Sequence, residues 1–388
     1  MPLKTSLPAS TPRLLLVCFL LALSLFLLSA CTGTAIGPCR ASVQNGIETL
    51  CGFKNPEDIR RLPDQKTLLI SEVGILGKPS SGSLKFFDTQ SKNINQAFPF
   101  DAAMNQAAVN PPAGQSVWGA SNCPGSPGTE FSPLGISVQQ RSDGRWQVAA
   151  VNHGQRQSIE MFELIKVGAH YGLEWRGCVI PPEEVLMNSV TLLRNGGFLA
   201  THMFDRQAPS LFGVSTGIWK SQLGIDTGYV FEWQPEKATE FRILAGSHGP
   251  FLNGIELSAD EASVFFSVTS ANEIRKLDRV SGKLIGSTHM ERPDNLSWDS
   301  QGFLLAASLT GSRLENFICI QHTGETCGLA FQIYRIDPKD MSKQLLFAHE
   351  GAPMGAATVA QPLGDALYLG SFTGDRILKI PYPPAEST

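Results

Sequence analysis

Four short phrases of the sequence place amide or carboxylate side chains next to the start of an apolar run. They are Asn55-Pro56-Glu57-Asp58, Met187-Asn188-Ser189, Leu252-Asn253-Gly254-Ile255 and Pro293-Asp294-Asn295-Leu296. A single Asn or Asp in such a place is typical of a turn or a cap, where the side chain bonds to nearby backbone. Four at matching places can instead converge, and carboxylate and amide oxygens are the ligands that a hard cation such as Ca²⁺ prefers. We therefore treat these phrases as candidate metal ligands.

A repeated unit of strand, polar turn and strand positions these phrases. Its turns are of the Asp-Gly and Asn-Gly type, which joins antiparallel strands in hairpins. The second strand of each unit is predicted at 67–71, 146–151, 198–201, 264–268, 303–307 and 366–370. Six units predict an all-β, six-bladed β-propeller, in which the first strand of every blade lines a central channel. A tandem of two β-sandwiches is the structural alternative.

Composition excludes several classes of protein. Of the 388 residues, 42% are hydrophobic and 17% are charged, which excludes a disordered chain. The net charge of −4 provides no basic footprint for nucleic acid. We expect a monomer with no nucleic-acid partner, and a single propeller domain over residues 39–388.

The N-terminal segment has the pattern of an export signal. Lys4 and Arg13 precede an unbroken apolar run over residues 14–30, which predicts a signal peptide over residues 1–30. A retained membrane anchor and ordinary secretion are the alternatives, because a run of this length is at the lower limit for a spanning helix.

The end of this run is similar to the lipobox of bacterial lipoproteins, in which a cysteine is lipidated and becomes the first residue. It reads Leu28-Ser29-Ala30-Cys31. We predict a lipid anchor on Cys31 and a short tether over residues 31–38. Thr32 is not the Asp that commonly retains such proteins at the inner membrane. The expected location is therefore the bacterial cell envelope, at the outer membrane facing the periplasm.

Six further cysteines follow Cys31, and an oxidising compartment favours their pairing. None is part of a Cys-x-x-Cys motif, so a zinc site has little support. Six cysteines allow many connectivities. We predict sequential pairing, as Cys39–Cys51, Cys123–Cys178 and Cys319–Cys327.

Several phrases resemble, in their order and spacing, those of a known family. They are Gly46-Ile47-Glu48-Thr49, Pro56-Glu57-Asp58, Pro133-Leu134-Gly135-Ile136-Ser137, Val151-Asn152-His153, Met187-Asn188, Asn253-Gly254-Ile255, Asp294-Asn295-Leu296-Ser297, 355–359 and 367–372. The family is that of the paraoxonases and arylesterases, within the wider propeller group of gluconolactonases and strictosidine synthase-like proteins. The resemblance covers about residues 39–380. It implies a calcium-dependent hydrolase of small esters or lactones.

The resemblance also implies which side chains hold the catalytic calcium: Glu57, Asn188, Asn253, Asp294 and Asn295. Two carboxylates balance the charge of Ca²⁺, and three amides add neutral oxygens. Further coordination positions stay open to water or substrate. A cation held in this way can polarise an ester or lactone carbonyl and stabilise the developing oxyanion.

The chain departs from the family pattern at two places. A second, structural calcium would use Asp58, the backbone carbonyl of Ile136 and an Asp where this chain has Ser189, so we expect that site to be weak or absent. The family's water-activating His is replaced by Leu134, although the second His of its pair is present as His153.

Two residues are candidates for the catalytic base. One is His153, which lacks its usual partner. The other is Asp294, as the gluconolactonase branch suggests, because a carboxylate on the metal can also accept a proton from water. Leu134 favours an alternative function, a non-catalytic propeller that keeps calcium for stability and binds a small molecule or a protein. A strictosidine synthase-like enzyme, which needs an acidic group and no metal, is a second alternative.

Overall fold

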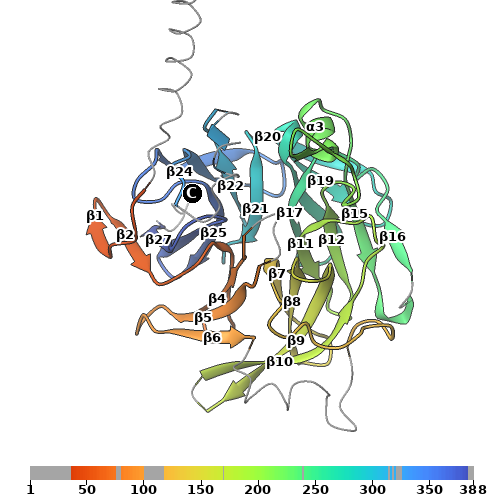
Figure 1. The fold of residues 1–388 in the computed structure, drawn as a ribbon, viewed down its shortest axis with the longest axis horizontal. Helices are drawn as coiled ribbons and strands as arrows, with labels where there is room; N and C mark the ends of the chain where they lie inside the picture. Colours follow the sequence, from red (N-terminus) through yellow and green to blue (C-terminus); the bar gives the residue numbers. More distant parts are fainter. Residues whose placement is uncertain are drawn as a thin grey trace, which may run out of the picture.

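Six antiparallel sheets surround a common centre in the computed structural model, and each sheet is one blade of a propeller (Figure 1). The six-bladed β-propeller predicted from the sequence is therefore confirmed. The structure describes residues 36–75, 80–99, 118–168, 170–237, 240–312, 315–316, 319 and 326–382. The predicted signal peptide and Cys31 lie outside these residues. Within them, no helix is both long enough and apolar enough to cross a membrane.

Each blade runs outward from its innermost strand. The innermost strands are β3 (Pro56–Arg61), β7 (Pro133–Gln140), β11 (Met187–Leu192), β17 (Leu252–Leu257), β21 (Pro293–Trp298) and β25 (Ala357–Leu363). The second strands are β4 (Thr67–Glu72), β8 (Trp146–Asn152), β12 (Phe198–His202), β18 (Ser263–Val268), β22 (Leu304–Leu309) and β26 (Ala366–Ser371). Every second strand overlaps one that the repeated unit predicts, because the polar turn of each unit is a hairpin turn.

The outer half of each blade completes the sheet. The third strands are β5 (Ser83–Asp88), β9 (Ser158–Val167), β15 (Tyr229–Trp233), β19 (Glu273–Asp278), β23 (Phe331–Ile336) and β27 (Arg376–Pro381). The fourth strands are β6 (Ile94–Phe98), β10 (His170–Val179), β16 (Phe241–Ile243), β20 (Leu284–His289), β24 (Lys343–His349) and β2 (Ile47–Cys51).

The two ends of the described chain close the ring together. β2 pairs with β27, with Leu50 opposite Ile377, and β1 (Ser42–Gln44) adds a fifth strand outside β2. In Figure 1 the red strands β1 and β2 therefore lie beside the blue strand β27. Closure by both ends ties the first blade to the last and leaves the channel lined by one strand from each blade.

Apolar side chains fill the spaces between neighbouring blades. Phe98 meets Phe131 and Phe162 edge to face, with ring centroids 5.0 and 4.9 Å apart. In the third blade Phe198 stacks on Trp233 at 5.5 Å. Burial of such a side chain stabilises the fold by about 2–3 kcal/mol, so these layers hold the blades in a fixed relation around the channel.

Helices are short and lie in connections. The segment between β12 and β15 contains β13 (Ser210–Leu211), β14 (Val214–Ser215) and the helix α3 (Thr216–Gln222). The Ser215 side chain caps α3 by accepting a hydrogen bond from the Gly217 N–H. Two 3₁₀ turns occupy Pro235–Lys237 and Thr269–Ala271.

Three disulfides staple the outer segments. They join Cys39 to Cys51, Cys123 to Cys178 and Cys319 to Cys327, which is the predicted sequential pairing.

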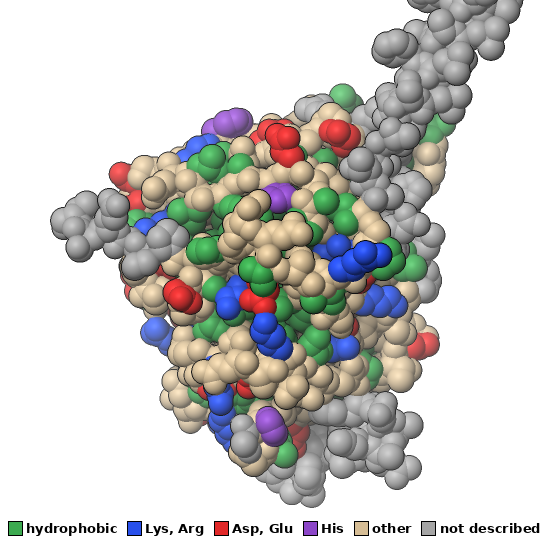
Figure 2. All heavy atoms as spheres, turned by 90° about the vertical axis from the view of Figure 1, so that its left-hand side faces the viewer, with side chains coloured by type: hydrophobic (Ala, Val, Ile, Leu, Met, Phe, Trp, Pro, Cys, Tyr) green, Lys and Arg blue, Asp and Glu red, His purple; other side chains and the backbone are tan. Residues whose placement is uncertain are grey.

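The side that carries β1 and β2 faces the viewer in Figure 2, where acidic and basic side chains are interspersed. This mixture agrees with the small net charge of −4.

Candidate metal centre

A register shift interrupts the pairing near the start of every innermost strand. The residues inside the six shifts are Glu57, 134–135, 188–189, 253–254, 294–295 and Thr358. Such bulges re-aim side chains and are frequent beside active sites. All five side chains expected to hold the catalytic calcium lie inside these shifts. The irregularity of the strands thus brings residues from four blades to one level of the channel.

Strained backbone precedes four of the bulges. Asn55, Phe251, Arg292 and Ala356 come directly before innermost strands and have φ angles of 48°, 59°, 35° and 52°. Residues other than glycine adopt this left-handed region at a cost, and such strain gathers at functional sites. The surrounding structure therefore fixes the turn that leads into each of these strands.

We call Glu57, Asn188, Asn253, Asp294 and Asn295 the oxygen ring. All five are buried. The Asn295 Nδ2 donates to Glu57 Oε1 at 2.7 Å, and Asn253 is hydrogen-bonded to the Asp294 side chain. Four oxygens of the ring are buried without a hydrogen-bond partner, namely Glu57 Oε2, Asn188 Oδ1, Asn253 Oδ1 and Asn295 Oδ1. A buried acceptor left unpaired costs about 1–3 kcal/mol, so four of them at equivalent places of the innermost strands favour a shared partner.

Burial disfavours the charged form of both carboxyls of the ring. Burial, together with the nearby charges of Asp58 and Asp294, raises the pKa of Glu57 well above its ordinary value. Burial raises the pKa of Asp294 from 3.8 to about 8, although the Asn253 amide opposes this shift. A divalent cation would neutralise both carboxylates and give the orphaned amide oxygens a partner.

This donor set fits a hard cation. It contains two carboxylates and three amide oxygens, which is the chemistry that Ca²⁺ prefers. Among the described residues, no three His, Cys, Asp or Glu side chains lie together so that they could hold a metal. In the oxygen ring only two of the five candidate ligands are carboxylates, and the other three are amides.

Hydroxyl groups that the sequence analysis missed hold the ring in place. Thr201 Oγ1 and Ser267 Oγ each donate at 2.6 Å, to the backbone carbonyls of Asn253 and Asp294. Thr358 Oγ1 donates to the Glu57 carbonyl at 2.7 Å. Thr201 and Ser267 both stand one residue before the end of a second strand. That shared offset is the signal by which the sequence could have revealed them.

Glycine allows the bulges of neighbouring blades to touch. A Cβ added to Gly254 would lie 2.6 Å from both the Cα of Asn295 and the carbonyl oxygen of Asp294. No side chain fits at that distance. The Asn-Gly sequence of the third phrase therefore reflects close backbone approach as well as a metal ligand.

The residues expected to hold a second calcium contact an arginine instead. The Arg60 guanidinium is 3.3 Å from Asp58 Oδ2, and its Nε donates to the Ile136 carbonyl at 2.7 Å. Asp58 also accepts the N–H groups of Ile59 and Ile136, each at 2.8 Å. The third expected ligand, Ser189, is neutral. These residues do not fit a second divalent cation.

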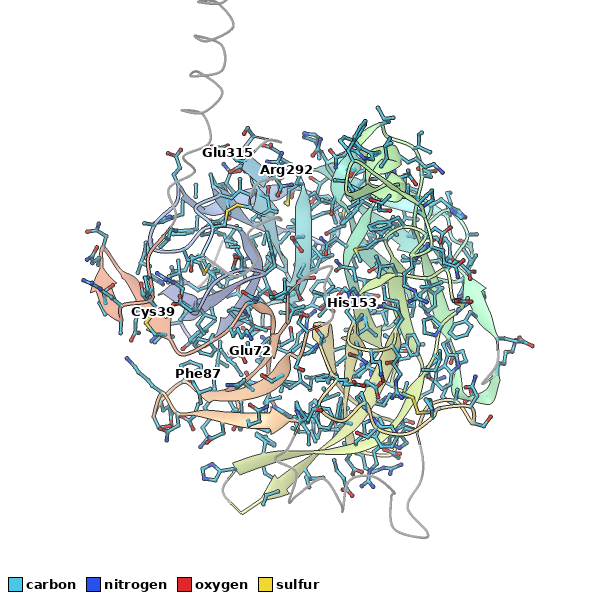
Figure 3. The ribbon with its side chains drawn as sticks, in the orientation of Figure 1. Cys39, Glu72, Phe87, His153, Arg292 and Glu315 are labelled. Atoms are coloured by element: carbon cyan, nitrogen blue, oxygen red, sulfur yellow. A yellow bond between two sulfur atoms is a disulfide. The ribbon has the colours of Figure 1, made fainter. Side chains whose placement is uncertain are left out.

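His153 lies on the inner side of the ring of blades (Figure 3). Its Nε2 lies 2.6 Å from the Met187 carbonyl, which only accepts, so we assign the ring proton to Nε2. Burial lowers the pKa of His153 to about 4, and the Met187 carbonyl opposes this shift. His153 is therefore uncharged near neutral pH and is a weak base.

Leu134 occupies the bulge of β7, the place that Asn188 and Asn253 hold in β11 and β17. Its side chain is buried and packs in the apolar cluster that includes Val151 and Met187. One blade thus contributes an apolar side chain at the bulge where two other blades contribute an Asn of the oxygen ring.

No protein-family model and no curated protein matches the chain. Among solved structures, a luciferin-regenerating enzyme is 12% identical over 86% of this chain and 94% of its own, with a TM-score of 0.50. A gluconolactonase from Xanthomonas campestris is 14% identical over 90% and 98%, with a TM-score of 0.48. The calcium-binding protein regucalcin from Agrobacterium tumefaciens is 13% identical over 89% and 95%, with a TM-score of 0.44. The likeness to the luciferin-regenerating enzyme shows a shared propeller fold.

Proposed function

We propose that the protein is a calcium-dependent hydrolase of small esters or lactones, similar to paraoxonases, with the oxygen ring as its metal site. One observation carries the proposal: four buried oxygens without partners gather around two carboxyls in the channel. A divalent cation satisfies such acceptors and balances negative charge at the same time.

Each part of the site has a role in this reaction. When bound, Ca²⁺ would polarise the carbonyl of the ester or lactone as a Lewis acid. Asn188, Asn253 and Asn295 would hold the cation through their neutral oxygens. Asp294 accepts the proton of the attacking water as the carbon–oxygen bond forms. It then returns this proton to the alkoxide that leaves when the ester bond breaks.

The base is assigned to Asp294 because of the state of His153. With a pKa of about 4 and its Nε2–H directed at the Met187 carbonyl, His153 has little capacity to take a proton from water. Asp294 lies within the oxygen ring itself. We therefore give His153 a positioning role through the backbone next to Asn188.

A non-catalytic propeller that binds calcium and a small molecule is the second candidate. Leu134 favours it, because the ring lacks the histidine of the family at this place. Both candidates need the same metal, so calcium binding alone does not separate them.

A hydrolysis assay separates them. A panel of aryl esters and lactones is incubated with the purified protein before and after chelation, and again after calcium is restored. We expect turnover that is lost with chelator and recovered with calcium. The Glu57→Gln variant should show no turnover under any of these conditions. Calcium binding without turnover on any substrate would favour the non-catalytic propeller.

We further propose that the protein is anchored in the bacterial envelope through a lipid on Cys31. The Leu-Ser-Ala-Cys sequence at the end of the apolar run supports this. Cys31→Ser should release the protein from the membrane fraction or block processing. Normal processing and retained membrane association of this variant would refute the anchor.

A further inference from the structure

Arg60 lies in the centre of the propeller and touches four innermost strands. Besides Asp58 on its own strand and the Ile136 carbonyl on β7, its Nη1 donates to the Leu296 carbonyl on β21 at 2.8 Å. The same Nη1 is 3.0 Å from Glu256 Oε1 on β17. We call Arg60 and these four partners the arginine cluster. A single guanidinium therefore joins blades that are not neighbours in sequence.

The cluster contains its own cation, Arg60, which faces the carboxyls of Asp58 and Glu256. Arg60 is 7% exposed and Asp58 fully buried. Both oxygens of Asp58 accept backbone N–H groups, and Arg60 supplies the positive charge beside them. A buried charge is stable only when it is paired and hydrogen-bonded, and both conditions hold here.

The cluster directly follows the oxygen ring along two strands. Asp58 follows Glu57 in β3, and Leu296 follows Asn295 in β21. A contact that fixes the backbone at Asp58 and Leu296 therefore also limits where the two ring side chains before them can lie. The planar guanidinium, with several donors in a fixed fork, suits this role better than a lysine would.

We propose that Arg60 is a cation built into the chain, which takes the place of a second metal ion and positions the oxygen ring for the first. The assignment rests on the proposed function, since the ring must hold calcium. It makes Arg60 a positioning residue, and it predicts that no metal enters the arginine cluster while Arg60 is present.

Counting calcium ions by native mass spectrometry tests the exclusion. The unmodified protein and Ser189→Asp should each hold one tight ion, because the added carboxylate pairs with Arg60. Arg60→Ala combined with Ser189→Asp should hold two, because Asp58, the new Asp and the Ile136 carbonyl are then free to bind a metal. Two ions in Ser189→Asp alone, or one in the folded double variant, would overturn the proposal.

Calcium affinity tests the positioning role. Arg60→Met should weaken binding of the single calcium by about tenfold. Arg335→Met is the matched control, because Arg335 is 8% exposed and lies 3.3 Å from buried Asp299, away from the oxygen ring. It should lose stability to a similar degree and keep its calcium affinity. Equal affinities in the two folded variants would overturn the role.

Two results of these experiments have a separate meaning. If Arg60→Met does not fold, the count for Ser189→Asp decides alone: one ion supports the proposal and two ions overturn it. If the unmodified protein holds no calcium, the proposed function fails. In that case the positioning role of Arg60 fails with it, and the counts test only the exclusion of a metal from the arginine cluster: an ion gained by Ser189→Asp overturns the exclusion, and none gained supports it.

Discussion

The oxygen ring and the arginine cluster are successive levels of one channel, and they solve the same electrostatic problem in opposite ways. In the ring, Glu57 and Asp294 have no cationic side chain within hydrogen-bonding distance among the described residues, and four oxygens lack partners. In the cluster, Asp58 and Glu256 face Arg60, and both oxygens of Asp58 are hydrogen-bonded. Burial is similar at the two levels. Among the described residues, only the ring therefore lacks a cationic side chain of its own.

This contrast explains how one strand geometry can give either a binding site or a structural bond. Both levels use side chains and carbonyls that converge from the innermost strands. In the arginine cluster, the guanidinium of Arg60 is a permanent cation for the carboxyls around it. An exchangeable cation leaves coordination positions for substrate. The difference depends on whether the chain itself supplies the positive charge.

The largest expected effect comes from removing the proposed base. Asp294→Asn keeps a similar shape and cannot accept the proton of water, so kcat should fall by at least about 100-fold. Activity must be measured at saturating calcium, because the substitution also weakens the metal site. Glu256→Gln, the matching change in the arginine cluster, should leave kcat within about threefold of the unmodified protein. Normal turnover of Asp294→Asn would show that the base lies elsewhere.

Calcium removal should destabilise the protein in a pH-dependent way. Without the cation, folding raises the pKa of Asp294 from 3.8 to about 8, and that of Glu57 also rises, both through burial first. Their contribution to stability is then full below about pH 4 and is lost as the pH rises through 8.

Because calcium cancels this loss, the rise in Tm on adding calcium should be at least about 5 °C larger at pH 8 than at pH 5. Differential scanning fluorimetry with chelator or calcium measures it. The same experiment on Glu57→Gln should give a smaller difference. A calcium effect that is equal at both pH values would contradict the proton–metal competition.

His153 should matter less than Asp294. Its neutral ring donates to the Met187 carbonyl, and the glutamine of His153→Gln can keep a donor there. This variant should therefore lower kcat/KM by about tenfold or less, which corresponds to at most about 1.4 kcal/mol in activation free energy. Because the pKa of His153 is about 4, its loss should not shift the pH profile above pH 5. Kinetics over pH 5 to 9 check both statements. Complete inactivity of His153→Gln would move the base to this residue.

The smallest change should come from placing a histidine at Leu134, where the sequence resemblance predicts one. Leu134→His places an imidazole at the bulge of β7, beside the oxygen ring, and should raise lactone hydrolysis by a few fold. Replacement of a buried leucine also costs stability, so rates are compared at a temperature where both proteins are folded. Leu134→Gln is the control for polarity without a base. Equal rates in the two variants would mean that no base can act from this place.

Much of the fold could be predicted from the sequence because its signals are local. The turn between first and second strands recurs in every blade. It predicts six hairpins, whatever the length and path of the segments that connect them. The long connection between β12 and β15, with its short helix α3, has no counterpart in the repeated unit. Its sequence around Thr216 lacks an amphipathic pattern of sufficient length to predict a helix.

Equivalent places in four units drew attention to the phrases that hold the oxygen ring, and the family resemblance selected its five members. The structure places all five inside the bulges, and their binding of calcium stays a prediction. Arg60 was missed because charged side chains in a strand are usually solvated. The period of two residues along a strand places Asp58 and Arg60 on the same face, and this was the available signal. The positions of the bulges could not be predicted from the sequence, since strand register depends on pairing and not on composition.

The number of calcium ions held by the unmodified protein and by Glu57→Gln tests the difference between the two levels most directly. Both are equilibrated with calcium, dialysed mildly and weighed by native mass spectrometry. We predict one ion per chain in the unmodified protein and none in Glu57→Gln, because the oxygen ring then lacks one of its two charges. No ion in the unmodified protein, or an ion that Glu57→Gln retains, would contradict the assignment of the oxygen ring as the metal site.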